Sequence, residues 1–217
     1  MSILNIMETP FQIRNAKLAE VIVKNLKSRY FDAYYCSTKA EALGKIMELI
    51  PSDDVVAWGG SMTMEAIGVI DEVRKSRKVI DRDNETDRAK KVEMMRQALL
   101  ADTFLMGTNA ITIDGELFNI DANGNRVAAL TFGPKQVIVA CGMNKVTASI
   151  EEAIARVRST AAPINAQRFP IQTPCKVNGV CIDCKSKDSI CCSFVRTRLC
   201  HFPGRIKVVL IGESLGL

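Results

Sequence analysis

The chain has 217 residues, of which 47% are apolar and 24% are charged, and its net charge is +5. This length and balance are typical of one soluble α/β domain, and a surplus of five charges is too small to predict nucleic-acid binding. No apolar run approaches the roughly 20 residues of a membrane helix. The opening MSILNIMETPFQ lacks the basic and apolar regions of a secretory signal. We therefore expect a cytoplasmic protein that binds neither membrane nor nucleic acid.

Helices and strands are predicted to alternate through the first half of the chain. Thr9 is expected to cap a helix that has Pro10 at its first position and ends near Arg29. The patterns that follow predict, in order, a strand at 32–36, a helix at 38–49, a strand at 54–58, a helix from 61, a short strand at 79–80 and a helix at 85–100.

The middle of the chain is predicted to be richer in strands. After a strand at 103–106, the pairs Asp114-Gly115 and Asn123-Gly124 each lie between apolar segments. Both pairs are strong hairpin signals, so we expect an antiparallel meander here. A buried strand at 135–141, a helix at 147–160 and a final strand at 207–211 complete the chain.

This order of elements predicts an α/β fold with an open, mostly parallel sheet, helices on both faces and one antiparallel insertion. Residues 1–217 are expected to form a single domain. The segment from about 169 to 204 begins and ends with prolines and has little periodicity. We expect it to be a cysteine-rich excursion from the core.

A glycine-rich loop follows the strand at 54–58 and opens a helix. Gly59 and Gly60 would let backbone N–H groups approach a ligand closely, and Ser61 and Thr63 add hydroxyl donors. In open α/β folds, ligands bind at this end of the strands. The loop is therefore a candidate site for phosphate or carboxylate, and the alternative is a tight turn with Ser61 as the helix cap.

Three further residues near strand ends are candidates for the same site. Asn109 follows the strand at 103–106, and Lys145 follows the strand at 135–141. Arg126 follows the second turn signal, and its planar guanidinium suits carboxylate or phosphate. The alternatives are a turn asparagine and exposed basic residues.

Three carboxylates are candidates for acid–base chemistry, whereas the only histidine is His201 and no Ser-His-Asp triad can be built. Glu65 in the helix after the glycine-rich loop and Asp114 and Glu116 in the first hairpin are the candidates. Asp121 is more typical of a turn former.

Five of the eight cysteines lie between Thr173 and Cys192. The spacing C-x5-C-x2-C-x6-C over Cys175, Cys181, Cys184 and Cys191 favours a four-thiolate site, which both zinc and an iron–sulfur cluster accept. Redox disulfides and an unremarkable loop are the alternatives. Residues 146–217 also carry 10 basic and 5 acidic side chains, whereas residues 1–145 carry 19 of each. Such a surplus could offset the negative charge of a thiolate site or simply form a solvated face.

The blocks WGGSMTMEAIG, GTNAITIDGELFNIDANGNRVAAL, FGPKQVIVACGMNKV and EEAIARVR resemble the LUD domain of lactate-utilisation proteins, in the same order. The resemblance runs from about Arg14 to Leu217. It implies a fold similar to the superfamily of sugar-phosphate isomerases and CoA transferases. In that superfamily, glycine-rich loops at strand ends hold phosphates or CoA-like groups, and the matching positions here include Gly59, Gly60 and Ser61.

Lactate-utilisation complexes oxidise L-lactate with iron–sulfur subunits, so the resemblance implies organic-acid oxidation or electron transfer with redox partner subunits. This chain lacks the tandem ferredoxin-like cysteine repeats of the iron–sulfur subunit. The alternative is an isomerase or acyl-transferase-like enzyme that acts on phosphorylated or CoA-linked molecules and has only a structural zinc. Both hypotheses require a small anionic ligand, and a homo-oligomer is compatible with either.

Overall fold

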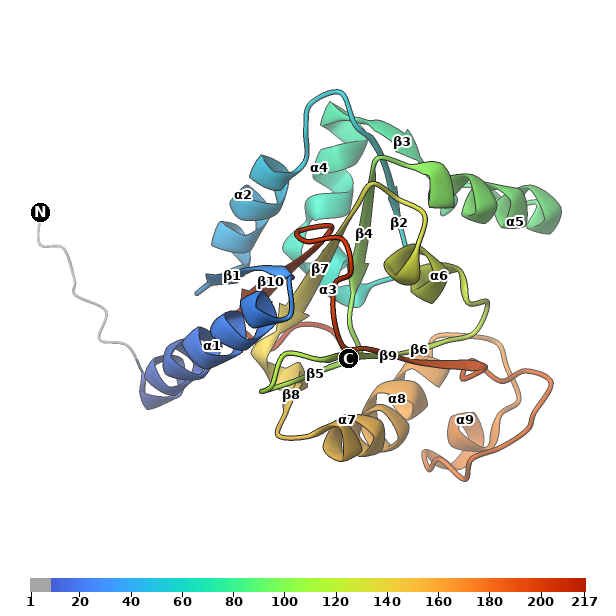
Figure 1. Cartoon of the computed structure of the whole chain (residues 1–217). Helices are drawn as coiled ribbons and strands as arrows, with labels where there is room; N and C mark the ends of the chain where they lie inside the picture. Colours follow the sequence, from blue (N-terminus) through green and yellow to red (C-terminus); the bar gives the residue numbers. More distant parts are fainter. Residues whose placement is uncertain (1–8) are drawn as a thin grey trace, which may run out of the picture.

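The computed structural model describes residues 9–217 and is built on a six-stranded sheet in which every neighbouring pair is parallel. Figure 1 shows this sheet at the centre of the molecule. In spatial order its strands are β1 (Asp32–Cys36), β10 (Ile206–Ile211), β7 (Gln136–Gly142), β4 (Thr103–Gly107), β2 (Val55–Trp58) and β3 (Lys78–Ile80). The predicted open parallel sheet is confirmed. The prediction that the chain has no secretory signal falls largely on residues 1–8, which lie outside the described residues.

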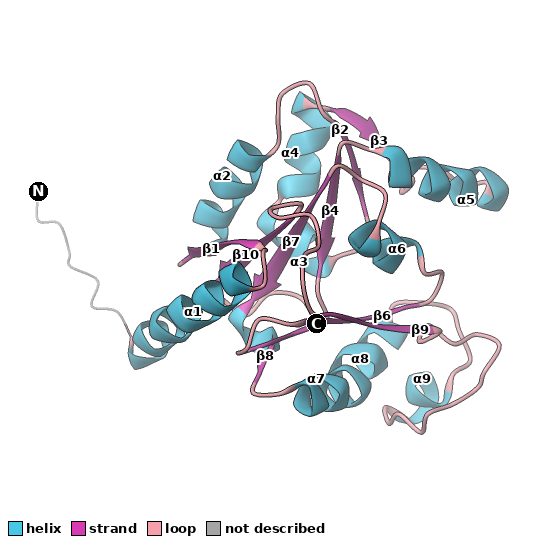
Figure 2. Ribbon diagram, in the orientation of Figure 1, coloured by secondary structure: helices cyan, strands magenta, loops and turns pink. Residues whose placement is uncertain are grey.

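Helices cover both faces of this sheet, as predicted (Figure 2). On one face, buried side chains come from α2 (Lys39–Leu49), α3 (Met62–Ile67) and α4 (Val69–Ser76). On the other face they come from α1 (Pro10–Ser28), the 3-10 turn Ala98–Leu100 and α6 (Asn125–Thr131). Thr9 and Gln12 form a capping box at the start of α1, where the sequence predicted the cap.

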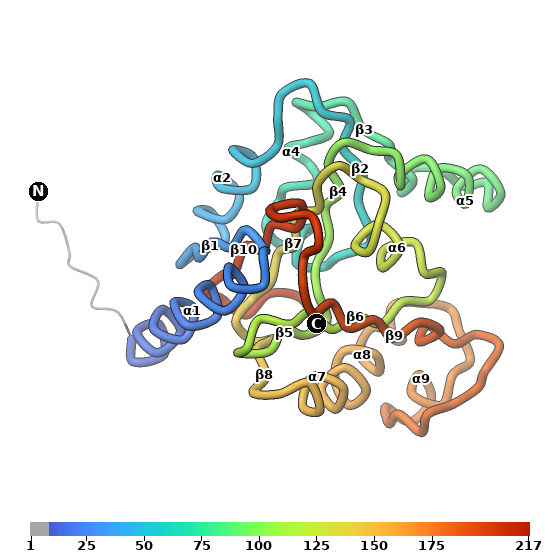
Figure 3. Tube along the Cα trace, in the orientation of Figure 1, coloured from blue at the N-terminus to red at the C-terminus, as the bar shows by residue number. Residues whose placement is uncertain are grey.

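A second sheet lies beyond the carboxyl ends of the central strands. Its order is β8 (Val146–Thr147), β5 (Ala110–Thr112), β6 (Leu117–Asp121) and β9 (Ser193–Thr197). The trace in Figure 3 leaves the first sheet after β4 to form β5 and β6, and leaves it again after β7. The second sheet packs on α7 (Ile150–Arg156), a π-helical turn (Val157–Ala161) and α8 (Ala162–Ala166).

The hairpin predicted at Asp114-Gly115 is confirmed, because β5 and β6 pair antiparallel across it. The hairpin predicted at Asn123-Gly124 is wrong. Gly124 takes a positive φ of 79°, but the next element is helix α6 and not the second strand of a hairpin. The Asp121 carboxylate accepts the backbone N–H groups of Arg126 and Val127 in the first turn of this helix. The Asn123-Gly124 pair therefore precedes a helix and does not form a hairpin turn.

Some predicted boundaries also shift. The helix predicted at 85–100 begins as α5 (Arg88–Gln97), because the Asp87 side chain caps it, and α5 has no buried residue. The helix predicted at 147–160 begins at Ile150, because Thr147 belongs to β8. Beyond Arg156 the helical path continues through the π turn into α8.

The cysteine-rich segment is more than an excursion. It contains a short helix, α9 (Pro174–Asn178), and then β9, which pairs antiparallel with β6 over five residues. The segment therefore completes the second sheet before the chain returns to the first sheet as β10.

No helix among residues 9–217 has the length and apolar character that crossing a membrane would demand.

Candidate anion-binding cleft

A cleft of about 610 Å³ opens where the carboxyl ends of β2 and β4 face the second sheet and α8. This volume falls within the range of small-molecule sites. Five basic side chains line it: Arg82, Lys91, Arg126, Lys145 and Arg168. Three acidic side chains line it as well: Glu65, Asp83 and Asp121. The lining therefore has an excess of positive charge, which favours an anionic ligand.

The predicted glycine-rich loop forms one wall of the cleft. Gly60 and Ser61 line it, and the Ser61 hydroxyl caps α3 by accepting from the Met64 N–H at 3.3 Å. A Cβ added to Gly59 would lie 2.9 Å from side-chain carbons of Arg126, and one added to Gly107 would lie 2.7 Å from Ser61 Oγ. Glycine at these two positions therefore lets the loop pack closely on its neighbours, and Ser61 is both a cap and part of the wall.

Arg126 connects the two sheets at the base of the cleft. Nη1 donates to the Gly107 carbonyl at 3.0 Å and to Asn119 Oδ1 at 2.7 Å. Nη2 donates to Asn109 Oδ1 at 2.9 Å and to the Ile120 carbonyl at 2.6 Å. Both terminal nitrogens are thus occupied by protein acceptors. Burial lowers the pKa of Arg126, whereas the Asp121 carboxylate, 3.8 Å from Nε, raises it.

Lys145 is the buried cation of the cleft, with only 4% of its surface exposed. Its Nζ donates to Thr63 Oγ1 at 2.8 Å, and Thr63 Oγ1 in turn donates to the Leu215 carbonyl at 3.2 Å. Within residues 9–217 no carboxylate pairs with this ammonium. Burial is the main reason that the pKa of Lys145 falls from 10.5 to about 8, and the positive charges of Arg156 and Arg126 add to it.

The structure brings together most of the predicted binding residues. Gly60, Ser61, Asn109, Arg126 and Lys145 line the cleft. Thr63 lies behind Lys145 and holds it through the hydrogen bond described above. Gly59 lines a smaller adjoining cavity of about 210 Å³.

The predicted catalytic carboxylates are divided between two places. Glu65 lines the cleft, and its carboxylate lies 3.8 Å from Arg168 Nη2. Asp114 and Glu116 do not line the cleft and instead bind arginines next to α1. Glu116 is 4% exposed and accepts from Arg196 Nε and Nη2, both at 2.8 Å, while Asp114 pairs with Arg29.

Sequence reasoning missed Arg82 and Arg168 as cleft residues. Arg82 lies two residues beyond β3, and a basic residue just after a parallel strand is a usable signal. The signal is weak here because β3 is only three residues long. Arg168 follows α8, and no local pattern indicates that α8 faces the cleft.

The cysteine segment forms part of the same cleft, since Phe169, Pro170, Ile171 and Ile190 line it. The pKa of the Cys191 thiol is raised to about 11, mainly by burial and then by electrostatic repulsion from Cys175, Cys181, Cys184 and Cys192. The other three predicted ligands therefore lie within electrostatic range of Cys191. As placed, however, no three His, Cys, Asp or Glu side chains among the described residues form a group that could hold a metal ion.

Three cysteines outside this group have buried side chains. Cys36 and Cys141 are buried in the two cores that flank the first sheet. Cys200 is also buried, and its thiol lies 2.9 Å from the Phe202 carbonyl.

Comparison with known proteins gives a family and a fold. The family model of the LUD domain matches residues 19–211. A DUF162 family protein from Deinococcus radiodurans has a crystal structure similar to this one, with a TM-score of 0.55 at 13% identity, and the match covers 91% of this chain and 98% of that one. At this identity the likeness supports the fold alone.

A second structure, eIF2B delta from Chaetomium thermophilum, matches with a TM-score of 0.26 at 18% identity, over 66% of this chain and 54% of that chain. Such a score is too low to carry an argument. No curated protein matches the sequence.

The ion pairs of the first hairpin lead to a prediction that separates structural from catalytic carboxylates. Glu116→Gln should lower the free energy of unfolding by about 1 to 2 kcal/mol, because the buried Glu116 carboxylate then no longer offsets the charges of Arg29 and Arg196, although the Arg196 side chain is 49% exposed. Asp114→Asn should cost less than about 1 kcal/mol, because Asp114 is 70% exposed.

Denaturant unfolding measures both values, and sulfate titration of the folded variants measures anion binding. We expect both variants to bind sulfate as the unmodified protein does. A loss of sulfate affinity in folded Glu116→Gln would contradict a purely structural role.

Proposed function

Because the chain belongs to the LUD domain family, we propose that it binds a small organic anion in the cleft and serves organic-acid oxidation or electron transfer. The family supplies the biochemical setting, and the cleft supplies the ligand chemistry. The observation that carries the proposal is the buried ammonium of Lys145.

A buried ammonium without a counter-charge is costly, since burial removes its hydration. Lys145 has one protein acceptor, Thr63 Oγ1, and three N–H donors. An anion in the cleft would accept the remaining donors and neutralise the charge. Such charge-assisted hydrogen bonds are stronger than those between neutral groups. Because a bound anion would remove the free-energy cost of the uncompensated ammonium, that cost adds to the affinity for the ligand.

The placement of the carboxylates favours this proposal over the isomerase or acyl-transferase alternative. Two of the three candidate acid–base groups, Asp114 and Glu116, are bound to arginines outside the cleft. Of the remaining acids at the cleft, Asp121 caps α6 and Asp83 accepts from the Trp58 indole at 2.7 Å. Glu65 is therefore the only predicted acid–base group at the cleft.

We also propose that the cysteine segment takes up a metal or iron–sulfur cluster through Cys175, Cys181, Cys184 and Cys191. The support is their approach to Cys191 and the wall that their segment shares with the cleft. Coordination would need the thiols to draw closer than they are placed, because no coordinating group is present among residues 9–217. A bound divalent ion would also favour the thiolate form of Cys191, which burial disfavours.

The first prediction from this proposal concerns anion affinity and pH. Sulfate keeps its charge across the alkaline range, so changes in its affinity report on the protein. Because Lys145 has a lowered pKa of about 8, we expect sulfate affinity to be highest below that pH. Above it, affinity should fall by up to about tenfold per pH unit as the ammonium loses its proton.

Isothermal titration calorimetry at constant ionic strength measures this profile. Lys145→Met should weaken sulfate binding by about 10- to 100-fold, the value of a charge-assisted hydrogen bond, and flatten the profile. Lys17→Met, on the exposed face of α1, is the matched control and should change neither. Equal affinities for the unmodified protein and folded Lys145→Met would refute anion binding by Lys145.

The second prediction concerns metal. Protein purified without oxygen should contain iron with acid-labile sulfide, together with the visible absorption of a cluster, and Cys184→Ser should lose both. Cys36→Ala, in β1, is the control and should keep them. Zinc alone would make the segment a structural clamp and remove electron transfer from the proposal. Finding neither metal would eliminate the metal site.

A further inference from the structure

Arg82 is a second cation of the cleft whose hydrogen-bonding capacity is unused. Its side chain is only 13% exposed, and none of its nitrogens forms a hydrogen bond within residues 9–217. Nε is fully buried and without an acceptor. Guanidinium groups buried to this degree are usually paired, because an unpaired buried donor costs about 1 to 3 kcal/mol. The missing acceptor points to a ligand.

The nearest carboxylate does not fill this role. Asp83 Oδ1 lies 3.8 Å from Arg82 Nε, beyond hydrogen-bonding distance. The other oxygen, Oδ2, accepts from the Trp58 indole at 2.7 Å and lies 3.9 Å from Arg74 Nη2. Asp83 is therefore shared among three partners and leaves the fork of Arg82 without a bidentate acceptor.

The position of Arg82 makes it accessible to a ligand. Arg82 and Gly60 both line the cleft, and a Cβ added to Gly60 would lie 3.7 Å from Arg82 Nη2. Because Gly60 has no side chain, the glycine-rich loop leaves the guanidinium uncovered on that side. A planar fork next to open space suits a carboxylate or phosphate group.

Arg82 and Lys145 have different neighbours in the cleft, since Arg82 Nη2 lies next to Gly60 whereas Lys145 Nζ donates to Thr63 Oγ1. Arg126 interacts electrostatically with both. Burial lowers the pKa of Arg126, and the positive charge of Arg82 lowers it further, whereas the negative charge of Asp121 raises it. The charge of Arg126 contributes in turn to the lowered pKa of Lys145, on which Arg82 has no resolved effect. Both terminal nitrogens of Arg126 are occupied by protein acceptors, so the cleft offers Lys145 and Arg82 as two further cationic positions.

We propose that the natural ligand of the cleft is a small dianion, by which we mean a molecule with two separated acid groups whatever the charge of a phosphate among them, with one group bound by Lys145 and the other by Arg82. This inference rests on the proposed function and names its substrate class. The shared chemistry is a dicarboxylate or a phosphorylated carboxylate. A monocarboxylate such as lactate could neutralise only one of the two positions.

The test compares probes that differ by one acid group. L-Lactate and L-malate share a 2-hydroxy acid and differ by one carboxylate, and 3-phosphoglycerate carries a phosphate in place of the second carboxylate. Calorimetry at constant ionic strength and at pH 7.5, below the pKa of about 8 for Lys145, should show at least one dianion binding about tenfold or more tightly than lactate. A preference for malate would identify the second acid group of the ligand as a carboxylate, and a preference for 3-phosphoglycerate would identify it as a phosphate.

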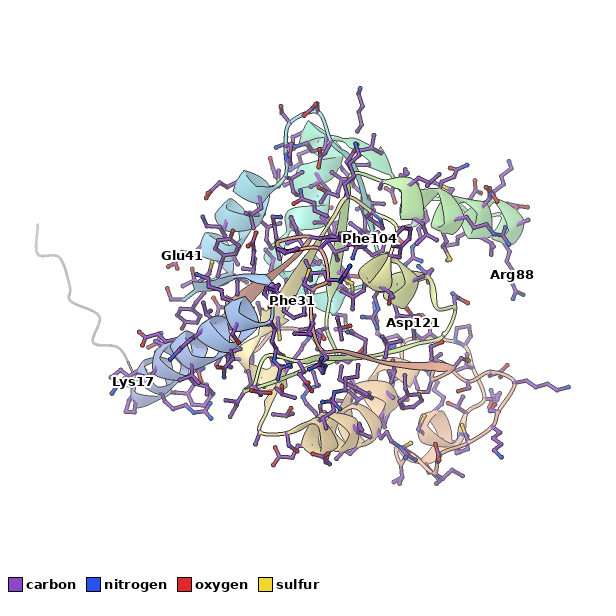
Figure 4. All side chains as sticks on the ribbon, viewed as in Figure 1. Lys17, Phe31, Glu41, Arg88, Phe104 and Asp121 are labelled. Atoms are coloured by element: carbon purple, nitrogen blue, oxygen red, sulfur yellow. The ribbon has the colours of Figure 1, made fainter. Side chains whose placement is uncertain are left out.

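Variants test whether Arg82 binds the second acid group of the ligand. Arg82→Gln should bring the affinity for the preferred dianion down to that for lactate and leave lactate binding unchanged. Lys145→Met should weaken all three probes. Arg88→Gln removes the same charge from exposed α5, where Figure 4 shows the side chain pointing into solvent, and should change none of them. Thermal unfolding confirms that each variant is folded.

The outcomes separate this inference from the proposed function. Lactate binding as tight as that of both dianions, or an Arg82→Gln variant that weakens lactate and dianions equally, would overturn the dianion inference and leave anion binding intact. If neither lactate nor either dianion binds to the unmodified protein, the proposed function fails and the inference fails with it.

Discussion

The guanidinium of Arg126 holds the two sheets of this protein in a fixed relation. Its four hydrogen bonds reach the end of β4 at Gly107, the connecting residue Asn109, and Asn119 and Ile120 in β6. Only an arginine offers so many donors in one plane. The cleft exists because these contacts set the second sheet across the carboxyl ends of the central strands. Gly59 contributes by leaving room for the Arg126 side chain.

The three central cations of the cleft therefore have different roles. Arg126 is bonded to protein oxygens and supports the architecture. Lys145 is buried and Arg82 is mostly buried, but both lack protein counter-charges that would stabilise them fully. In a protein without a ligand this arrangement reduces stability, because desolvated charges are left without compensation. Such a cost is typical of binding sites, where a ligand supplies the compensation.

Sequence patterns were sufficient for the fold and for part of the cleft. Buried parallel strands read as short apolar runs, and the residues that follow them, such as Ser61 and Lys145, meet at one sheet edge by topology. The hairpin predicted at Asn123-Gly124 is wrong because a glycine with positive φ can precede a helix as well as form a hairpin turn. The helix is favoured here because the Asp121 carboxylate accepts the first N–H groups of α6. The position of Glu116 outside the cleft was not predictable for a similar reason, since its arginine partner lies 80 residues away in the chain. Tertiary partners at such separations leave no local trace.

The central claim is that Lys145 is a buried, uncompensated cation that an anion neutralises. The most direct measurement is the pKa of its amino group by NMR of selectively labelled lysine, with and without sulfate. The account predicts a pKa near 8 in the free protein and a clear rise when sulfate binds, because the bound anion favours the charged form. A pKa near the ordinary lysine value of 10.5 that sulfate does not change would contradict it.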